Sequence, residues 1–239
     1  MESAPVLRGP LQILSPKGEY AVIASLPKNS LSLAVKAQEA GADAILLNID
    51  GDDNAHPSHL GGYDLHDAYI SDVISTVSIP CGIFIGGARP VTADYWERIM
   101  SSNFRFAEMF AHQMPLFVLS DTRVSKIVAV ATGYVLEQVR QLSQTDGVMA
   151  LDAATVPSQA RGTPFSALDY ATLGIIVNLS AKPVVLRTQK RMARADVDSV
   201  MRLGVKGLVV DQAILSGTDE AYRDELASLC PRRQDPGQQ

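Results

Sequence analysis

Eight apolar runs of strand length recur along this chain of 239 residues, and segments with helical periodicity separate most of them. Strands that read as continuous apolar runs are typical of parallel sheets that are buried on both faces. Eight strand–helix units in a chain of this length match the usual size of a (βα)8 barrel, roughly 250 residues. The eight runs are Tyr20–Leu26, Ala44–Ile49, Cys81–Ile85, Phe104–Phe110, Lys126–Ala131, Gly147–Leu151, Val184–Leu186 and Leu208–Val210.

The intervening segments favour one α/β architecture, a single (βα)8 TIM barrel. Gly41 and Gly204 follow the first and the last predicted helix, where glycine supplies a left-handed C-cap. An open doubly wound sheet is the alternative, but it usually has fewer strands and a glycine-rich first turn, whereas Leu26–Asn29 reads Leu-Pro-Lys-Asn. The predicted helices are Ser30–Ala40, Tyr69–Val77, Thr92–Ser101, Tyr134–Leu142, Pro164–Leu179 and Arg194–Leu203.

Composition predicts one domain over residues 1–239, since 46% of the chain is hydrophobic and no Pro/Gly/Ser-rich linker divides it. A formal net charge of −5 argues against a nucleic-acid or membrane-surface partner, and no apolar run reaches the ~18 residues of a membrane span. Met1–Pro10 lacks the pattern of a signal peptide, and the two cysteines lie far apart in sequence, which favours a cytoplasmic setting. Residues 230–239 are polar and rich in helix breakers, so we expect a disordered tail.

Polar and ionisable residues follow the predicted strands at their C-terminal ends, where (βα)8 enzymes carry their active sites. Most of the opposite strand ends carry Pro, Gly or Lys. This asymmetry predicts an active face. The substrate-binding candidates on it are Asn48, Asp50, Arg89, Arg187, Thr188, Gln189, Lys190, Asp211 and Gln212, and the catalytic candidates are Lys28, Glu108, His112 and Asp152.

Two carboxyl groups lead the catalytic candidates, because a charged residue in a buried strand needs either a partner or a function. Glu108 precedes His112 by four residues, and the two could act as an acid–base pair. Packing of His112 among aromatic residues is the alternative. Asp152 follows the apolar run Gly147–Leu151 and is the candidate base. Schiff-base chemistry would need Lys28 or Lys190, the lysines within reach of this face, and is not favoured.

The connection after the second strand is long and contains three of the four histidines of the chain. A connection of this type usually takes ~2 to 6 residues, and longer ones are often functional. We therefore expect Gly51–Tyr63 to be a mobile lid. A divalent-metal site is possible but not favoured, because the spacing of its candidate ligands matches no specific metal motif; these ligands are Asp50, Asp52, His56 and His59.

The segment Arg187–Asp196 carries four basic residues and leads into a predicted helix. Barrels that bind phosphate hold it on the loops after strands seven and eight, with the help of a helix N-terminus. Thr188 and Lys190 lie nearest to the strand end and are the preferred phosphate ligands. A solvated basic helix start is the alternative interpretation.

With these residues in view, the chain resembles the ribulose-phosphate-binding class of barrels, and most of all those similar to N-acylmannosamine-6-phosphate epimerase. The similar phrases are Ala37–Ile45, Ala150–Thr155 and Pro183–Ile214, about a third of the chain. The resemblance implies the barrel fold, an active-site Asp152 and sugar-phosphate chemistry. The glycines of the class after strands seven and eight are absent here: Thr188-Gln189 and Asp211-Gln212 stand instead. A lysine that the epimerases carry after strand three has no counterpart.

Together these features predict an enzyme that transfers protons next to a carbonyl, as an isomerase, epimerase or carbon–carbon lyase. Its partner would be a small, phosphorylated, sugar-like or carbonyl substrate, without a cofactor, and a homo-oligomer is possible. The alternative is a non-catalytic ligand-binding or assembly barrel that has lost the usual phosphate site.

Overall fold

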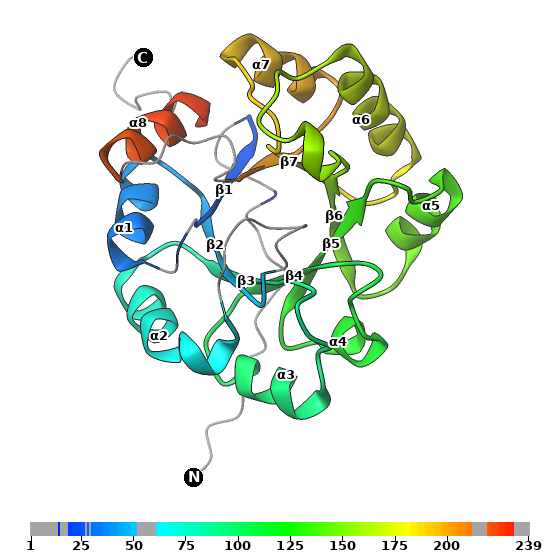
Figure 1. Cartoon of the computed structure of the whole chain (residues 1–239). Helices are drawn as coiled ribbons and strands as arrows, with labels where there is room; N and C mark the ends of the chain where they lie inside the picture. The colour runs from blue at the N-terminus through cyan, green and yellow to red at the C-terminus, as the bar shows by residue number, and fades with distance from the viewer. Residues whose placement is uncertain are drawn as a thin grey trace, which may run out of the picture.

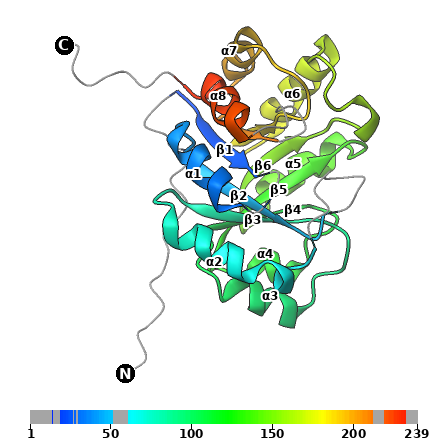
Figure 2. The same cartoon turned by 60° about the vertical axis from the view of Figure 1, so that its left-hand side comes forward.

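The computed structural model describes residues 14, 19–26, 28, 30–51, 61–211 and 219–231, apart from the side chains of residues 219 and 220. Eight parallel strands close into a barrel in sequence order, and β8 pairs with β1. Figure 1 shows the strands as an inner ring, and Figure 2 shows the helices as a layer outside it. The predicted single (βα)8 TIM barrel is confirmed.

The strands are β1 Ala21–Ser25, β2 Ala44–Ile49, β3 Cys81–Ile85, β4 Phe106–Phe110, β5 Ser125–Ala131, β6 Val148–Ala154, β7 Val184–Arg187 and β8 Gly207–Val210. The helices are α1 Leu31–Glu39, α2 Asp67–Thr76, α3 Ala93–Met100, α4 Leu116–Ser120, α5 Leu136–Gln144, α6 Ala167–Leu179, α7 Arg194–Arg202 and α8 Asp219–Leu229, and the short 3-10 turns η2 and η3 span Tyr63–Leu65 and Ser158–Ala160. Within the described ranges, no helix has the length and apolar character needed to cross a bilayer.

Several element bounds differ by one to three residues from the sequence-based expectation, and the largest differences are two additional helices and the end of β6. The expectation contained neither α4, which has five residues and so offers too short a periodic pattern, nor α8, which is rich in charged residues. β6 continues to Ala154, three residues beyond the predicted end at Leu151, so Asp152 lies inside the strand. The proposed tail at 230–239 begins with buried Cys230, whereas residues 232–239 lie outside the described part.

Alternate residues of each strand face the barrel interior or the surrounding helices, as the period of two requires. On β1, Val22 and Ala24 pack with the helices, whereas Ile23 belongs to a separate cluster inside the barrel. That inner cluster takes Ala150 and Ala154 from β6, so Asp152 between them also faces inward. The same alternation turns six buried polar side chains toward the interior near the C-terminal strand ends: Ser25, Asn48, Glu108, Asp152, Arg187 and Asp211.

Glycines account for two local features of this frame. Gly41 and Gly204 have φ of 97° and 103° after α1 and α7, which confirms the predicted C-caps. Inside the barrel, a Cβ on Gly82 would lie 2.3 Å from the ring of Phe106 on the neighbouring strand. The missing side chain on β3 therefore makes room for the large ring on β4.

Candidate active site

Arg187, the last residue of β7, organises a buried charged cluster at the C-terminal end of the barrel interior. Its Nε donates to Asp152 Oδ2 at 2.7 Å, and its Nη2 donates to Glu108 Oε1. Its Nη1 lies 3.5 Å from Asp211 Oδ2. All four side chains are at most 2% exposed. Strands β4, β6, β7 and the end of β8 thus bring three carboxyl groups around one guanidinium, and these three were among the predicted site residues.

The single positive charge of Arg187 cannot neutralise three carboxylates in an interior that is shielded from water. Burial raises the pKa of Glu108 well above its ordinary value; Arg187 works against this shift and the charge of Asp152 adds to it. Burial also opposes the charge of Arg187, yet the three carboxyl groups hold its pKa above the ordinary value. Burial and the neighbouring charge of Asp152 therefore favour the protonated form of Glu108, next to an arginine that stays charged.

Aromatic rings form one wall of this cluster and help to exclude water from it. The guanidinium carbon of Arg187 lies 5.0 Å from the centroid of the Phe84 ring. Phe84 meets Phe110 edge to face, with centroids 5.9 Å apart. Low polarity around the charges strengthens every electrostatic interaction within the cluster.

We expect Glu108→Gln to remove a loss of stability that accompanies rising pH above the ordinary carboxyl pKa. Because the folded-state pKa of Glu108 is raised, its contribution to the free energy of unfolding is fully present below the ordinary carboxyl pKa. That contribution is lost as pH rises through the folded-state pKa. Urea unfolding across a pH series should show this fall in the wild type and not in Glu108→Gln. Glu137→Gln, at an exposed position, serves as control and should keep the decrease in the free energy of unfolding with pH. If this free energy decreased equally steeply with pH in Glu108→Gln and in the wild type, the raised pKa of Glu108 would be contradicted.

A second cluster of polar residues follows β2 and β3, and in it the predicted binding residues Asp50 and Arg89 contact each other. Arg89 Nε donates to Asp50 Oδ1 at 2.6 Å, and Tyr95 Oη donates to Asp50 Oδ2 at 2.6 Å. The backbone N–H of Tyr63 donates to Tyr95 Oη at 2.7 Å. Asp50 has φ of 50°, a left-handed conformation that an aspartate adopts more readily than most residues. These contacts hold the loops together and occupy Arg89, so its binding of substrate stays a prediction.

Asn48 closes the interior on the side of β1 and β2. Its Nδ2 donates to Ser25 Oγ at 3.3 Å and to the carbonyl of Leu26 at 2.8 Å. Asn48 and the cluster around Arg187 lie in the same polar end of the interior. The role of Asn48 in substrate binding stays a prediction.

The residues after β7 already have partners within the protein. The backbone N–H of Asp211 donates to Thr188 Oγ1 at 3.0 Å. Lys190 Nζ lies 2.7 Å from Asp169 Oδ2 in the first turn of α6. Burial works to raise the pKa of Asp169, but hydrogen bonds from Lys190 and Ser166 outweigh it and lower that pKa. A phosphate at Lys190 would have to replace this carboxylate.

Gln189 connects β7 to the loop that follows β6. Its Oε1 accepts from the backbone N–H of Val156 at 3.0 Å, and its own carbonyl accepts from Gly162 N–H at 2.9 Å. The side chain is 1% exposed. Gln189 thereby positions a loop, a role that its sequence position alone did not reveal.

His112 and Lys28 lie apart from the buried cluster. His112 is exposed; its Nδ1 lies 2.6 Å from Tyr134 Oη, and its ring stacks on Phe110. Among the described residues, no hydrogen bond or ion pair joins His112 to Glu108, which pairs with Arg187 instead. Lys28 is exposed beyond β1. The two predicted catalytic carboxyl groups therefore lie together, without the predicted histidine.

Several expectations fall on residues that the structure does not describe. Gln212 lies there, as do residues 52–60 of the predicted lid with three of the four candidate metal ligands. In the described ranges, no three His, Cys, Asp or Glu side chains are grouped as metal ligands. The lid and the metal site stay predictions.

Arg161, on the loop between β6 and α6, was not among the predicted site residues. Its charge interacts with Asp211 and with Arg187 of the buried cluster. Its Nε is buried and has no hydrogen-bond partner in the described part of the chain. The segment around it contains no motif, so only the fold could place it at this site.

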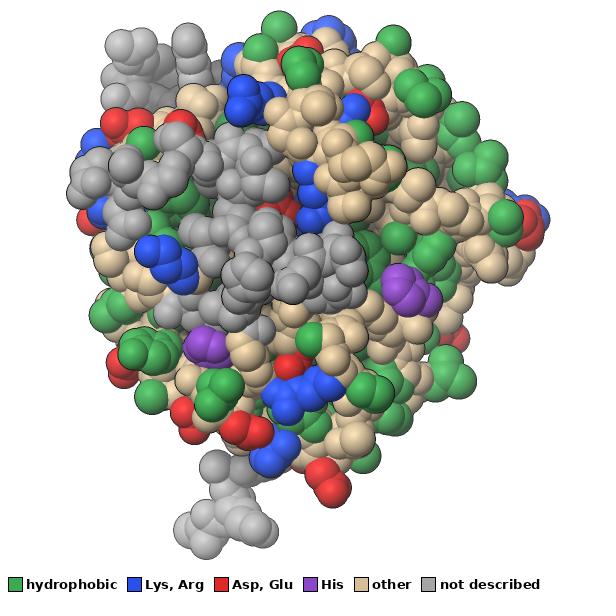
Figure 3. All heavy atoms as spheres, in the orientation of Figure 1, with side chains coloured by type: hydrophobic (Ala, Val, Ile, Leu, Met, Phe, Trp, Pro, Cys, Tyr) green, Lys and Arg blue, Asp and Glu red, His purple; other side chains and the backbone are tan. Residues whose placement is uncertain are grey.

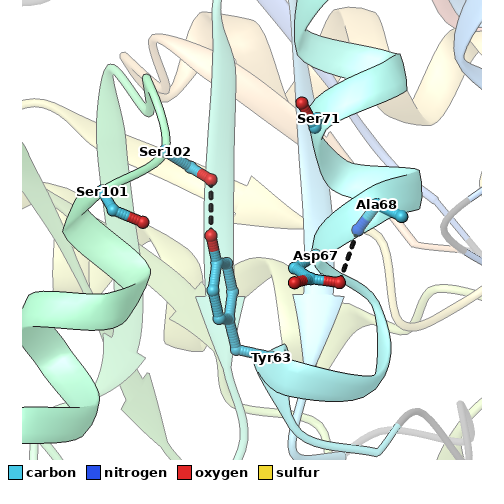
Figure 4. Close-up of a pocket in the computed structure, with 6 residues that line it drawn as sticks. All are labelled: Tyr63, Asp67, Ala68, Ser71, Ser101 and Ser102. Atoms are coloured by element: carbon cyan, nitrogen blue, oxygen red, sulfur yellow. Dashed lines mark hydrogen bonds between the residues drawn. The ribbon is translucent and has the colours of Figure 1, made fainter.

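A shallow groove of about 340 Å³ lies on the outer flank of the barrel, between the start of α2 and the end of α3. Figure 4 shows Tyr63 pointing across it to Ser102, with the two hydroxyl oxygens 2.7 Å apart. Asp67 there accepts a hydrogen bond from the N–H of Ala68. No residue of the Arg187 cluster lines this groove, so it is separate from the candidate active site.

The molecular face in Figure 3 carries acidic and basic side chains that are interspersed rather than gathered by sign. Many form local pairs on the surface, such as Arg140 with Glu137 and Arg194 with Asp198. Exposed pairs of this kind contribute little to stability.

Comparison with known proteins finds similarity at the level of structure. No family model matches the chain, and no curated protein matches it in sequence. A mutant tryptophan synthase α-subunit from Pyrococcus furiosus superposes with a TM-score of 0.64 at 15% identity, covering 89% of this chain and 98% of that one. Phosphoribosyl anthranilate isomerase from Thermus thermophilus gives 0.62 at 15% identity, covering 87% and 98%.

N-acetylmannosamine-6-phosphate 2-epimerase from Clostridium perfringens is also similar, with a TM-score of 0.59 at 12% identity, covering 84% of this chain and 90% of that one. At such identities the likeness establishes a shared fold. The expected structural resemblance to this group of barrels is therefore confirmed.

Proposed function

We propose that the chain is an enzyme that moves a proton at a carbon next to a carbonyl, in an isomerase, epimerase or lyase reaction. The observation that carries this proposal is the pair of buried carboxyl groups on one guanidinium: Glu108 and Asp152 with Arg187. Neighbouring carboxyl groups in different protonation states can divide the roles of acid and base.

The roles follow from the hydrogen bonds. Asp152 uses Oδ2 to accept from Arg187, and its Oδ1 has no hydrogen-bond partner in the described residues. That free oxygen would remove the proton from carbon. Glu108 accepts from Arg187 at Oε1, so its acidic proton belongs on Oε2, which is likewise without a partner among those residues. Glu108 would give this proton to the carbonyl oxygen as the enediol forms. Asp152 would then deliver its proton to the neighbouring carbon while Glu108 takes up the proton of the second hydroxyl, which completes an isomerisation.

Arg187 then acts as the fixed positive charge of the site. It stabilises the Asp152 carboxylate before reaction and would offset negative charge that develops on the substrate oxygen. The similar structures support the choice of substrate, because two of them are named for a phosphoribosyl compound and a sugar 6-phosphate. We therefore assign a small phosphorylated sugar or related carbonyl compound as substrate.

The test is proton exchange in deuterium oxide, followed by proton NMR, for a panel of aldose and ketose phosphates and their unphosphorylated forms. The wild type should replace the hydrogen next to the carbonyl by deuterium in at least one phosphorylated member. Loss of that exchange in Glu108→Gln would support the assignment. A wild type that binds sugar phosphates but exchanges no proton in any of them would favour the alternative, a non-catalytic ligand-binding barrel.

A further inference from the structure

Arg161 is a half-buried cation for which the described structure provides no ion-pair partner. Its Nε is shielded from solvent and forms no hydrogen bond within the described part of the protein. Leaving a buried charged group unpaired costs free energy, so such groups usually have a partner or a function. Arg187, the fully buried arginine of the site, is by contrast surrounded by three carboxyl groups.

Arg161 lies close enough to the buried cluster to interact with two of its side chains. Asp211 attracts its guanidinium and Arg187 repels it, and both of these side chains belong to the buried cluster. Burial is the main cause of a lowered pKa for Arg161, although an arginine remains charged at neutral pH. A charged donor thus lies at the same end of the barrel as Glu108 and Asp152.

Backbone pairing holds the loop of Arg161 in place. Directly after it, Gly162 N–H donates to the carbonyl of Gln189 at 2.9 Å. Arg191 N–H donates to the carbonyl of Thr163 at 3.0 Å, and Phe165 N–H donates to the carbonyl of Arg191 at 3.1 Å. These bonds flank an isolated parallel bridge between Pro164 and Arg191, so backbone contacts hold the segment that follows Arg161.

From this placement we infer that Arg161 binds an oxyanion of the substrate, a phosphate or a carboxylate, and holds the rest of the molecule over Glu108 and Asp152. The inference rests on the proposed function and assigns its anion site to the loop after β6. Lys190, the cation expected from the sequence, is paired with Asp169. A guanidinium also offers two parallel donors to a phosphate or carboxylate, which a lysine does not.

The experiment measures binding by calorimetry for inorganic phosphate, ribose phosphate, ribonate and ribose. In Arg161→Gln, affinity for the anionic probes should fall about 10- to 150-fold, the range for a lost charge-assisted hydrogen bond, whereas affinity for ribose should not change. Arg191→Gln is the matched control, because it removes an exposed arginine from the adjoining segment and should keep wild-type affinity. Loss for ribose phosphate alone would identify phosphate, and loss for ribonate alone would identify carboxylate.

Thermal unfolding of the same variants gives a second readout. Because Arg161 is partly desolvated and has no ion-pair partner among the described residues, Arg161→Met should raise the melting temperature in the absence of anions and abolish the stabilisation by phosphate. A lower melting temperature, with phosphate stabilisation intact, would show that Arg161 serves the fold instead. Absence of anion binding by the wild type, or a loss in Lys190→Met but not in Arg161→Gln, would overturn the inference.

Different results would contradict the proposed proton-transfer function and the proposed anion site at Arg161. Proton exchange that depends on Glu108, with anion affinity unaltered in Arg161→Gln, would leave the proposed function standing and remove the assignment of Arg161. Anion binding that depends on Arg161, without proton exchange on any substrate, would do the reverse.

Discussion

Replacement of Arg187 by methionine should cost more stability than any other single substitution in the candidate site. It would leave Asp152, Glu108 and Asp211 facing one another in the barrel interior without their shared cation. Breaking a buried ion pair by removing one partner costs about 3 to 5 kcal/mol. For a domain of this size that lowers the melting temperature by roughly 6 to 20 °C, at ~2 to 4 °C per kcal/mol.

Calorimetry or urea unfolding of Arg187→Met measures this cost, with the exposed Arg202→Met of α7 as control. The cost should shrink in a background that carries Glu108→Gln and Asp152→Asn, because the charges left behind are then fewer. Arg187→Lys keeps the charge but not the planar fork, so its stability should lie between wild type and Arg187→Met. A loss no larger than that of Arg202→Met would contradict the central place of Arg187.

Asp152→Asn should reduce the rate of proton exchange about 100-fold or more, because it removes the base while its amide oxygen can still accept from Arg187. The measurement is the rate of deuterium incorporation into the substrate that the wild type exchanges fastest. Asp146→Asn provides the control, since this exposed residue precedes the opposite end of the same strand, β6. Unchanged turnover in Asp152→Asn would remove Asp152 from the mechanism.

The barrel could be predicted because its strands carry a strong local signal. Runs such as Ala44–Ile49 and Cys81–Ile85 are buried on both faces, and the structure gives them the predicted bounds. The end of β6 was placed too early because Asp152 interrupts an apolar run. Asp152 can face inward there because it pairs with Arg187. Arg187 lies 35 positions away in the sequence, so the residues around Asp152 do not reveal this pairing.

The sequence predicted the location of the candidate site and some of its residues. Glu108, Asp152, Arg187 and Asp211 were identified from their places at strand ends, and the structure brings them together. These residues pair with one another only when the barrel closes, and no short stretch of the sequence shows which of them become neighbours. His112 was expected beside Glu108 from a separation of four residues, but the strand directs Glu108 inward and leaves His112 on the exposed rim.

The backbone pairing between residues 162–165 and 189–191 affects how a change in loop length would alter ligand binding in this protein. Pro164 pairs with Arg191 as in a parallel sheet. Arg161 precedes this bridge by three residues, so the bridge limits where the backbone of Arg161 can lie. We therefore expect a single-residue deletion between β6 and the bridge to move Arg161 relative to the buried cluster while every site residue keeps its identity. Ligand choice would then change through the length of a loop and not through residue type.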